Sequence, residues 1–305
     1  MQKTISIIIA IFNRKDELFE LLNSLIAQTD KNFEVIIVDD GSSVDLLPTV
    51  ETFKEMLEIQ YFKKTNSGPG LSRNYGAKRA KNDWLVFVDS DVIVEKDYIE
   101  NIKKNLENTD CAAFGGADKA HKGFNILQKA ISYSMTSVFT TGGIRGSKKA
   151  VTRFQPRSFN MGVNKEIFLK IGGFSEMRIG EDPDLSMTIW ENGYQTAFFD
   201  NIGVYHKRRT DLGKFSKQVY QFGCARPILN QRHPNYVKPT FWFPTLFLLG
   251  YVAGILEYFL LHKGFVLACY GIYTFVIFFH ALLLTKNLAI AAQAIITTYI
   301  QMFSY

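Results

Sequence analysis

Cysteine is scarce in this chain and is not arranged for chemistry. The sequence has three cysteines, Cys111, Cys224 and Cys269, in 305 residues. Their wide separation matches neither the close spacing of zinc ligands nor a disulfide framework. This scarcity argues against a disulfide-stabilised secreted domain and fits a reducing compartment.

Several other signals are missing. The N-terminal apolar run, residues 5–12, is too short for a secretory signal and has no small-residue cleavage site, so we interpret it as a buried strand. No nucleic-acid-binding motif accompanies the net charge of +6, and we expect no nucleic-acid partner. There is also no internal repeat and no low-complexity linker.

Formal charge is almost absent from the C-terminal part. From residue 241 onward the only charged residues are Glu257, Lys263 and Lys286. Residues 241–261 and 265–285 each supply the roughly 20 apolar residues that cross a bilayer core. Residues 287–305 form a shorter run with glutamine and threonine, which is either a third span or an interfacial helix.

Basic residues gather just before the first apolar run: Arg208, Arg209, Lys214, Lys217, Arg226, Arg232 and Lys238. Positive charge beside a span favours the cytoplasmic side of a membrane. We therefore expect a protein of the inner (cytoplasmic) membrane whose large domain faces the cytoplasm. The predicted organisation is a catalytic domain over 1–210, an amphipathic basic membrane-interface segment over 211–240 and two or three membrane or interfacial helices over 241–305.

The first half alternates strands and helices. Predicted strands cover residues 5–12, 33–38, 59–62 and 84–88, and helices cover about 16–26, 46–57 and 71–80. Short connections between such elements imply parallel strands joined by right-handed crossovers. We predict an α/β, doubly wound sheet, in which ligands bind beyond the carboxyl ends of the strands.

The second half is less regular. Predicted strands cover residues 111–116, 159–163, 196–199 and 203–205, and helices cover 124–139, 165–171 and 185–192. Residues 142–158 form a predicted loop with five cations: Arg145, Lys148, Lys149, Arg153 and Arg157.

Two carboxylates end the fourth strand. Asp89 and Asp91 are separated by one small residue and follow an apolar run. Two adjacent ionised carboxylates repel unless a cation neutralises them. Oxygen ligands of this kind suit Mg²⁺ or Mn²⁺, and we predict such a cofactor. The alternative is a turn that caps a helix starting near Glu95.

The order of short motifs resembles the family 2 glycosyltransferases, inverting enzymes of the GT-A fold. The resemblance covers residues 3 to about 210 and rests on six motifs: Phe12-Asn13-Arg14, Val38 to Ser42, Asn66 to Gly76, Asp89-Ser90-Asp91, Gly172-Gly173-Phe174 and Glu181-Asp182. Each motif alone is weak, whereas six in order are specific. The resemblance implies transfer of a sugar from a nucleoside diphosphate, with a UDP-sugar favoured.

The resemblance also implies roles on the donor side. Asn13, Asp40 and Arg73 would bind the nucleotide, with Asp40 accepting from the imide N–H of uracil or an equivalent donor. One of Asp39 and Asp40 is expected to act only as an N-cap. Arg73 follows a glycine-rich loop, a place suited to phosphate or base contact, although a plain surface arginine is the alternative.

Metal ligation is assigned to Asp91, and a ribose or outer contact to Asp89. The metal would stabilise the departing diphosphate. His206 matches a histidine that relatives use as a further ligand. It stands beside two cations, so the alternative is that it faces lipid phosphates.

On the acceptor side we assign Asp182 as the general base. It precedes a predicted helix, whose N-terminus stabilises negative charge and holds the carboxylate in place. By resemblance, Gly172, Gly173, Phe174 and Glu181 lie on the same side. The alternative is that the acids near the helix start only compensate its dipole.

The acceptor itself is less defined. No Gln-x-x-Arg-Trp motif follows Asp182, so we predict that one sugar is added per acceptor. An apolar stripe flanked by lysines, formed by Leu212, Phe215, Val219 and Phe222, is typical of a helix on an anionic membrane. With the cationic loop, it favours a phosphate-bearing, lipid-linked acceptor. The alternative is a packing helix and a solvated loop.

Two other functions stay open from the sequence. A polyprenyl-phosphate sugar synthase also joins a GT-A domain to C-terminal spans, but such enzymes generally lack the Gly-Gly-Phe and Glu-Asp pair. A catalytically silent, membrane-anchored sugar-nucleotide binder would not require Asp89, Asp91 and Asp182 together.

Overall fold

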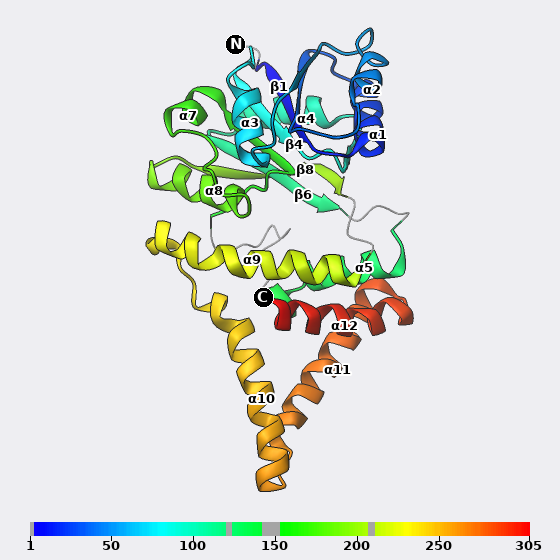
Figure 1. The fold of residues 1–305 in the computed structure, drawn as a ribbon, viewed down its shortest axis with the longest axis vertical. Coiled ribbons are helices and arrows are strands. Elements are labelled where there is room, and N and C mark those ends of the chain that lie inside the picture. The colour runs from blue at the N-terminus through cyan, green and yellow to red at the C-terminus, as the bar shows by residue number, and fades with distance from the viewer. Residues whose placement is uncertain (1–2, 120–123, 142–152, 207–210) are drawn as a thin grey trace. The chain divides into compact units, whose positions relative to one another are not determined.

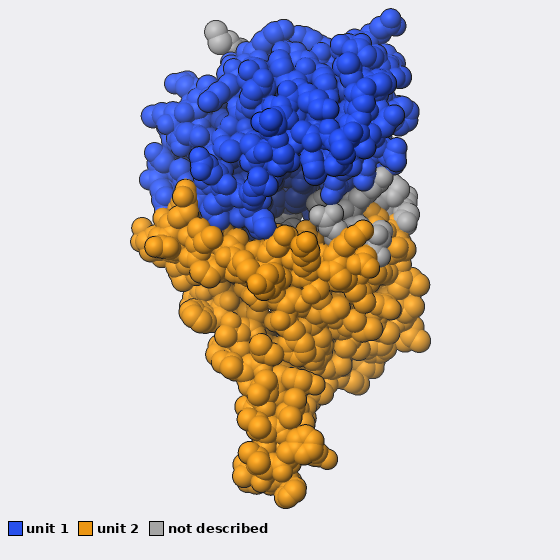
Figure 2. Space-filling model, in the orientation of Figure 1, with its two compact units in different colours: residues 1–119, 148–207 blue, residues 120–147, 208–305 orange. Residues whose placement is uncertain are grey.

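The computed structural model describes residues 3–119, 124–141, 153–206 and 211–305. The chain divides into two units, coloured separately in Figure 2. Unit 1 contains Met1–Lys119 and Lys148–Lys207, and unit 2 contains Ala120–Ser147 and Arg208–Tyr305. The predicted boundary at residue 210 lies close to the end of unit 1. Residues 120–147, which we predicted inside the catalytic domain, group instead with the C-terminal part.

Unit 1 is built on one eight-stranded sheet with the order β3-β2-β1-β4-β7-β6-β8-β5 (Figure 1). The strands are β1 Ile5–Ile11, β2 Phe33–Asp39, β3 Ile59–Lys63, β4 Trp84–Val88, β5 Val92–Val94, β6 Ala113–Lys119, β7 Asn160–Asn164 and β8 Thr196–His206. The first four strands pair in parallel, and β7 pairs antiparallel to β4 and β6. The predicted α/β class is confirmed.

Helices cover both faces of this sheet, as the continuous apolar strands require. They are α1 Lys15–Ile26, α2 Leu47–Glu51, α3 Pro69–Ala77, α4 Tyr98–Asn108, α7 Lys165–Lys170 and α8 Glu181–Glu191. Alternate residues of β1, such as Ile7, join a core with α1, α2 and α4. On the opposite face, the ring of Phe87 contacts those of Phe168 and Phe174. The period of two along each strand thus separates two apolar layers.

Three predicted elements differ from the structure. The helix expected over 46–57 ends at Glu51, because the apolar residues beyond it are buried by turns and not by helix. The helix expected from residue 185 begins at Glu181, so both predicted acceptor-side acids lie in its first turn. The two short strands expected near 196–205 are one strand, β8, whose register against β6 shifts between Gly116 and Asp118.

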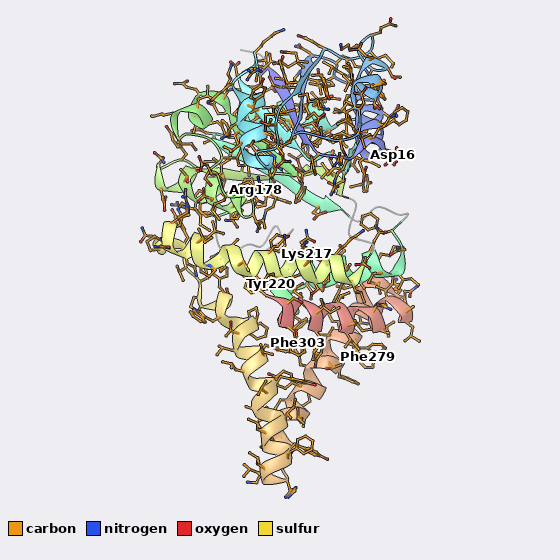
Figure 3. All side chains as sticks on the ribbon, viewed as in Figure 1. Asp16, Arg178, Lys217, Tyr220, Phe279 and Phe303 are labelled. Atoms are coloured by element: carbon orange, nitrogen blue, oxygen red, sulfur yellow. The ribbon has the colours of Figure 1, made fainter. Side chains whose placement is uncertain are left out.

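Unit 2 is helical. Its elements are α5 Ile126–Thr136, α6 Val138–Thr141, α9 Leu212–Arg232, the short 3₁₀ helices Pro234–Tyr236 and Pro239–Trp242, α10 Phe243–Leu261, α11 Phe265–Thr285 and α12 Leu288–Ser304. Pro239–Leu261 and Phe265–Thr285 are long and apolar enough to cross a membrane, and only 11% of each is buried. Large apolar side chains such as Phe279 on α11 project outward (Figure 3).

The helix α12 packs inside unit 2. Residues such as Ile290, Ala291 and Ala294 are buried in a cluster with Ala130 of α5 and Ile277 of α11. The glutamine and threonine content of α12 therefore belongs to a helix that is largely covered by protein along one side.

The apolar stripe of α9 also packs inside unit 2. Phe215 and Val219 are buried against Ile131 and Met135 of α5. The expectation that this stripe lies on lipid is wrong for these residues, since α5 covers them. The packing alternative holds, and the lysines of α9 occupy a different face. Of the predicted cationic loop, Arg145, Lys148 and Lys149 lie outside the described residues.

Candidate active site

The predicted donor-side residues lie at one edge of the sheet. Asn13 follows β1, Asp40 follows β2, and Asp89 and Asp91 follow β4. Asn13 has a φ of 54°, a conformation that asparagine tolerates better than most residues. Its Oδ1 accepts the backbone N–H of Ser43 at 2.8 Å and ties the end of β1 to the loop after β2.

Asp39 and Asp40 contact different parts of the chain, and neither caps a helix in the described part of it. Asp39 is fully buried, and it accepts the N–H of Ser42 at 2.8 Å and the hydroxyl of Tyr61 at 2.8 Å, so it is a structural turn residue. Asp40 holds the loop before α3.

The carboxylate of Asp40 is met by several donors. The N–H groups of Ser67 and Gly68 donate to it at 2.9 and 2.8 Å, and the ammonium of Lys64 also donates. Burial acts to raise the pKa of Asp40, but these hydrogen bonds outweigh burial and lower it. Asp40 is thus an ionised hydrogen-bond acceptor that contacts the loop 66–70.

Asp91 is paired with a cation of the chain itself. The guanidinium of Arg14, just after β1, donates to its Oδ2. Burial alone would lower the pKa of Arg14, but the charge of Asp91 raises it. The sequence motif around Asn13 contained this arginine, yet its partner could not be read from spacing.

The carboxylate pair fits a divalent ion in part. The Asp89 side chain is 32% exposed, and Mg²⁺ commonly takes one or two protein carboxylates and completes its shell with water and substrate phosphates. Within the described residues, no group of three or more His, Cys, Asp and Glu side chains is positioned to hold an ion. The backbone of His206 pairs with Val92, directly after Asp91, and its side chain lies outside the described part.

Arg73 is a buried bridge. One guanidinium nitrogen donates to Asp89 Oδ1 at 2.7 Å, and the other donates to Glu181 Oε1 at 2.9 Å. The guanidinium carbon lies 5.4 Å from the ring centroid of Phe174. The side chain is only 4% exposed, which rules out the surface-arginine alternative. Both of its NH₂ groups donate to carboxylates, and the nucleotide contact that we expected of Arg73 stays a prediction.

Glu181 is the other end of this bridge. The pKa of Glu181 is raised to about 7, mainly by burial and then by the charge of neighbouring Asp182, while Arg73 acts to lower it. The side chain is 9% exposed. Glu181 is therefore a buried acid that links the donor-side carboxylate to the start of α8.

Asp182 lies in the first turn of α8, next to Glu181. Its side chain is 17% exposed, and its Oδ2 is 3.5 Å from a guanidinium nitrogen of Arg157. Gly180, which precedes the helix, has a φ of 86°, so the chain turns sharply into the helix N-terminus. The aspartate is held at a positive helix end beside a cation and keeps contact with solvent.

The Gly-Gly-Phe turn is anchored by α3. Asn74 donates to the carbonyl of Phe174 at 2.7 Å and accepts the Phe174 N–H at 2.9 Å. Gly172 and Gly173 have φ values of 88° and 70°, and a Cβ on Gly173 would lie 2.6 Å from Asn74 Oδ1. Only glycine fits at position 173, because the left-handed backbone conformation and the close approach of Asn74 exclude a side chain there.

Adjacent residues of α3 therefore contact the predicted acceptor-side residues: Arg73 pairs with Glu181, and Asn74 holds the turn before α8. Sequence reasoning quoted Asn74 within a motif but gave it no role. It also missed the pairs that Arg14 and Arg157 form. The pairing of distant residues carries no signal in a single sequence.

These features agree with comparisons to known proteins. The model of the family described as Glycosyl transferase family 2 matches residues 6–171, more than half of the chain. This chain belongs to glycosyltransferase family 2. The match spans the sheet edge and α3, and it ends at residue 171, just before the Gly-Gly turn.

Relatives carry the same description. An uncharacterized glycosyltransferase of Haemophilus influenzae is 32% identical over 220 residues, which cover 68% of this chain and 70% of the relative. The uncharacterized glycosyltransferase YfnE of Bacillus subtilis is 36% identical over 233 residues, covering 72% of this chain and 57% of the relative. A Rickettsia felis glycosyltransferase is 41% identical over 103 residues, and the match spans only 17% of its length.

Solved structures share the fold. A mannosyltransferase of Pyrobaculum calidifontis, in complex with GDP-Man and Mn²⁺, has a TM-score of 0.60 at 17% identity and covers 96% of this chain and 86% of its own. Staphylococcus aureus TarS 1–349, in complex with UDP, has a TM-score of 0.55 at 20% identity and covers 98% and 90%. The GT-A-type architecture that the motifs implied is confirmed.

Proposed function

We propose that this protein is an inverting, non-processive glycosyltransferase that moves one sugar from a nucleoside-diphosphate sugar to a hydroxyl of a membrane-associated acceptor in cell-envelope synthesis. The observation that carries the proposal is the Arg73 bridge. It joins Asp89 at the donor edge of the sheet to Glu181, the neighbour of Asp182, by hydrogen bonds of 2.7 and 2.9 Å. A donor site and a candidate base are thus held in one rigid frame.

The donor binds at the carboxyl edge of the parallel strands. Asp40 offers an ionised acceptor for the N–H of a base, and Asn13 shapes the neighbouring loop. UDP is the favoured nucleotide. Solved relatives include TarS with UDP and with UDP-GlcNAc, although another holds GDP-Man.

A divalent ion, Mg²⁺ or Mn²⁺, would be held by Asp91, with Asp89 beside it, and would neutralise charge on the diphosphate leaving group. Arg14 donates to Oδ2 of Asp91, so an ion bound there would compete with this arginine for the carboxylate. The Mn²⁺ in the Pyrobaculum relative supports this assignment.

Asp182 acts as general base. It takes the proton of the acceptor hydroxyl while the hydroxyl oxygen attacks the anomeric carbon from the face opposite the diphosphate. The new C–O bond forms as the bond to the diphosphate breaks, and the configuration at the carbon inverts. Arg157 and the α8 N-terminus hold the carboxylate for this step.

The acceptor is held at a membrane. Two apolar helices, α10 and α11, are long enough to cross a bilayer and expose most of their surface. With the basic residues before α10, they support anchoring in the inner membrane with unit 1 in the cytoplasm.

A donor panel tests the proposal. Detergent-purified full-length protein is incubated with UDP-, GDP- and dTDP-sugars, with and without Mn²⁺, and then with a lipid extract. We expect metal-dependent release of one nucleoside diphosphate, stimulated by lipid. Nucleotide binding without any turnover under all conditions would contradict the proposal and favour the silent sugar-nucleotide binder.

A further inference from the structure

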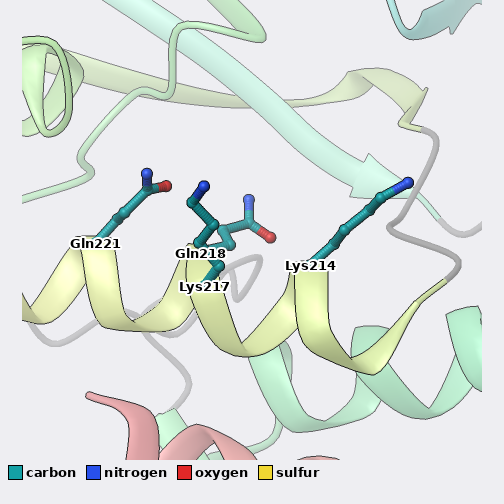
Figure 4. Close-up of a pocket in the computed structure, with 4 residues that line it drawn as sticks. All are labelled: Lys214, Lys217, Gln218 and Gln221. Atoms are coloured by element: carbon teal, nitrogen blue, oxygen red, sulfur yellow. The ribbon is translucent and has the colours of Figure 1, made fainter.

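Four polar side chains project from one face of α9. Lys214, Lys217, Gln218 and Gln221 line a hollow of about 180 Å³. Their spacing of three and four residues places them on neighbouring turns of the same helix face. Figure 4 shows all four side chains extending from the same side of the helix.

The N–H donors of this hollow have no acceptor in the part of the chain that the structure describes. Among the described residues, none of the four side chains donates a hydrogen bond or forms an ion pair. Each ammonium carries three N–H donors and each amide two. The nearest acid along the helix, Asp211, accepts the backbone N–H of Lys214 at 2.8 Å and caps the helix. The hollow therefore offers positive charge and N–H groups with no carboxylate in its lining.

The face that carries these groups is fixed by the rest of α9. On the opposite side Phe215 and Val219 are buried against Ile131 and Met135 of α5. A helix packed in this way cannot turn about its axis to solvate its lysines elsewhere. The polar face is thus a constant feature of unit 2, the unit that also contains α10 and α11.

We propose that the hollow lined by Lys214, Lys217, Gln218 and Gln221 binds a phosphate group of the membrane-held acceptor. Phosphate oxygens accept several N–H bonds at once, and lysine is a common point charge for phosphate. The phosphate is carried by a hydrocarbon-anchored molecule, because the helices suited to a bilayer belong to the same unit. The inference deepens the proposed function and rests on it.

Binding of small probes tests this assignment on the full-length protein in neutral detergent. The probes are farnesyl phosphate, farnesol and inorganic phosphate, measured by isothermal titration calorimetry. The test variant carries Lys214→Gln and Lys217→Gln, which keep side-chain length and remove both charges. The matched control carries Lys263→Gln and Lys286→Gln, two exposed lysines of the same unit.

We expect farnesyl phosphate to bind the protein and the control alike, and the test variant roughly tenfold more weakly, because the variant lacks both ammonium groups that would donate to the phosphate. Added salt should weaken this binding. Farnesol should bind much less. An equal loss of farnesyl phosphate affinity in the control and test variants, or no loss of affinity in either, would overturn the inference. Inorganic phosphate binding as tightly as farnesyl phosphate would replace the membrane-held ligand with a soluble anion and would also overturn it.

Failure of the two proposals can be told apart. If the donor panel shows turnover while the lysine pair leaves farnesyl phosphate binding unchanged, only the phosphate site is wrong. If farnesyl phosphate binds through the lysines while no donor is turned over, the site stands as a binding site and the transferase proposal fails.

Discussion

The two units hold different kinds of buried polar group, although unit 1 also buries polar atoms with no partner among the described residues, such as Arg73 Nε and Ser175 Oγ. In unit 1 the buried carboxylates of Asp39, Asp40 and Glu181 each accept a hydrogen bond from a residue distant in sequence. In unit 2 the helix α12 buries oxygens of Gln293, Thr298 and Gln301 that have no partner among the described residues. Both units have apolar cores, but charge pairs connect the candidate site of unit 1, whereas the polar groups of α12 are surrounded by apolar packing. A unit that binds a charged nucleotide needs fixed charges, and a unit suited to a bilayer does not.

The largest expected effect is in unit 1. Asp182→Asn removes the proton acceptor, so transfer should fall by about 10²–10⁴-fold, the usual contribution of a general base. Donor affinity, measured by titration calorimetry, should stay within about twofold, because the aspartate is assigned to the acceptor hydroxyl. Glu176→Gln, an exposed acid of the preceding loop, is the control and should keep full activity. Wild-type turnover in Asp182→Asn would reject the base assignment.

The next effect concerns the bridge. Arg73→Met leaves Asp89 and Glu181 without their buried cation, and breaking a buried pair of this kind costs about 3–5 kcal/mol of unfolding free energy. Thermal unfolding followed by tryptophan fluorescence measures it. Lys78→Met, an exposed change one turn along α3, should alter stability by less than about 0.5 kcal/mol. Equal stability of the two variants would show that the bridge is not the frame of the site.

The pH dependence of stability follows from Glu181. Its folded pKa of about 7 lies above the ordinary value of 4.5, so the folded protein binds the proton more tightly than the unfolded chain. This tighter proton binding stabilises the folded protein. The stabilisation is fully present below about pH 4.5 and is lost as pH rises through 7. Relative to Glu181→Gln, the natural protein should lose about 1–3 kcal/mol of unfolding free energy between pH 5 and 8.

The same unfolding assay, repeated from pH 5 to 8, shows directly whether the unfolding free energy falls or rises relative to Glu181→Gln. A gain in stability of the natural protein relative to Glu181→Gln as pH rises would mean that Arg73 keeps Glu181 ionised. In that case the attraction of the ion pair would exceed the cost of burying the carboxylate.

A smaller effect is expected on metal affinity when Arg14, the partner of Asp91, is replaced. Arg14→Gln frees Asp91 from a partly exposed ion pair of about 1 kcal/mol, so Mn²⁺ in the presence of UDP should bind roughly threefold to tenfold more tightly. Electron paramagnetic resonance of free Mn²⁺ measures this affinity, and Lys15→Gln is the neighbouring control. Weaker Mn²⁺ binding in Arg14→Gln would argue against Asp91 as the ligand that Arg14 occupies.

The smallest expected effect is on the stability of unit 2 and concerns two neighbouring threonines. Thr297 and Thr298 of α12 are both fully buried. Among the described residues only the Thr297 hydroxyl has partners, the carbonyls of Ala130 at 3.2 Å and Ala294 at 3.3 Å. Thr297→Val should cost about 1 kcal/mol, and Thr298→Val should be neutral or stabilising, since it removes an unpaired polar group. Thermal unfolding in detergent compares them. The opposite order would contradict the packing of α12 on α5.

Sequence patterns carried most of the fold. The continuous apolar strands 5–12 and 33–38 and their short connections identified a parallel sheet, and the sheet edge brought Asn13, Asp40 and Asp91 together as expected. Apolar spacing was misleading after Glu51, where turns bury the same residues as a helix would. It also could not show whether the α9 stripe packs on protein or on lipid, because both surfaces are apolar.

The site was only partly visible in the sequence. Carboxylates after strands are visible as motifs, but their cations come from elsewhere in the chain. Arg73 and Glu181 are 108 residues apart, and Arg14 and Asp91 are 77 apart. Such pairs depend on the tertiary fold, so a surface arginine and a buried bridge look alike before folding is known.

The stereochemistry of the product tests the central claim most directly. With the donor that the panel identifies, proton NMR of the product gives the configuration at the transferred anomeric carbon. A single displacement assisted by Asp182 predicts inversion, so an α-linked donor should yield a β-linked product. Retention of the donor configuration would require a different chemistry and would contradict the account of unit 1.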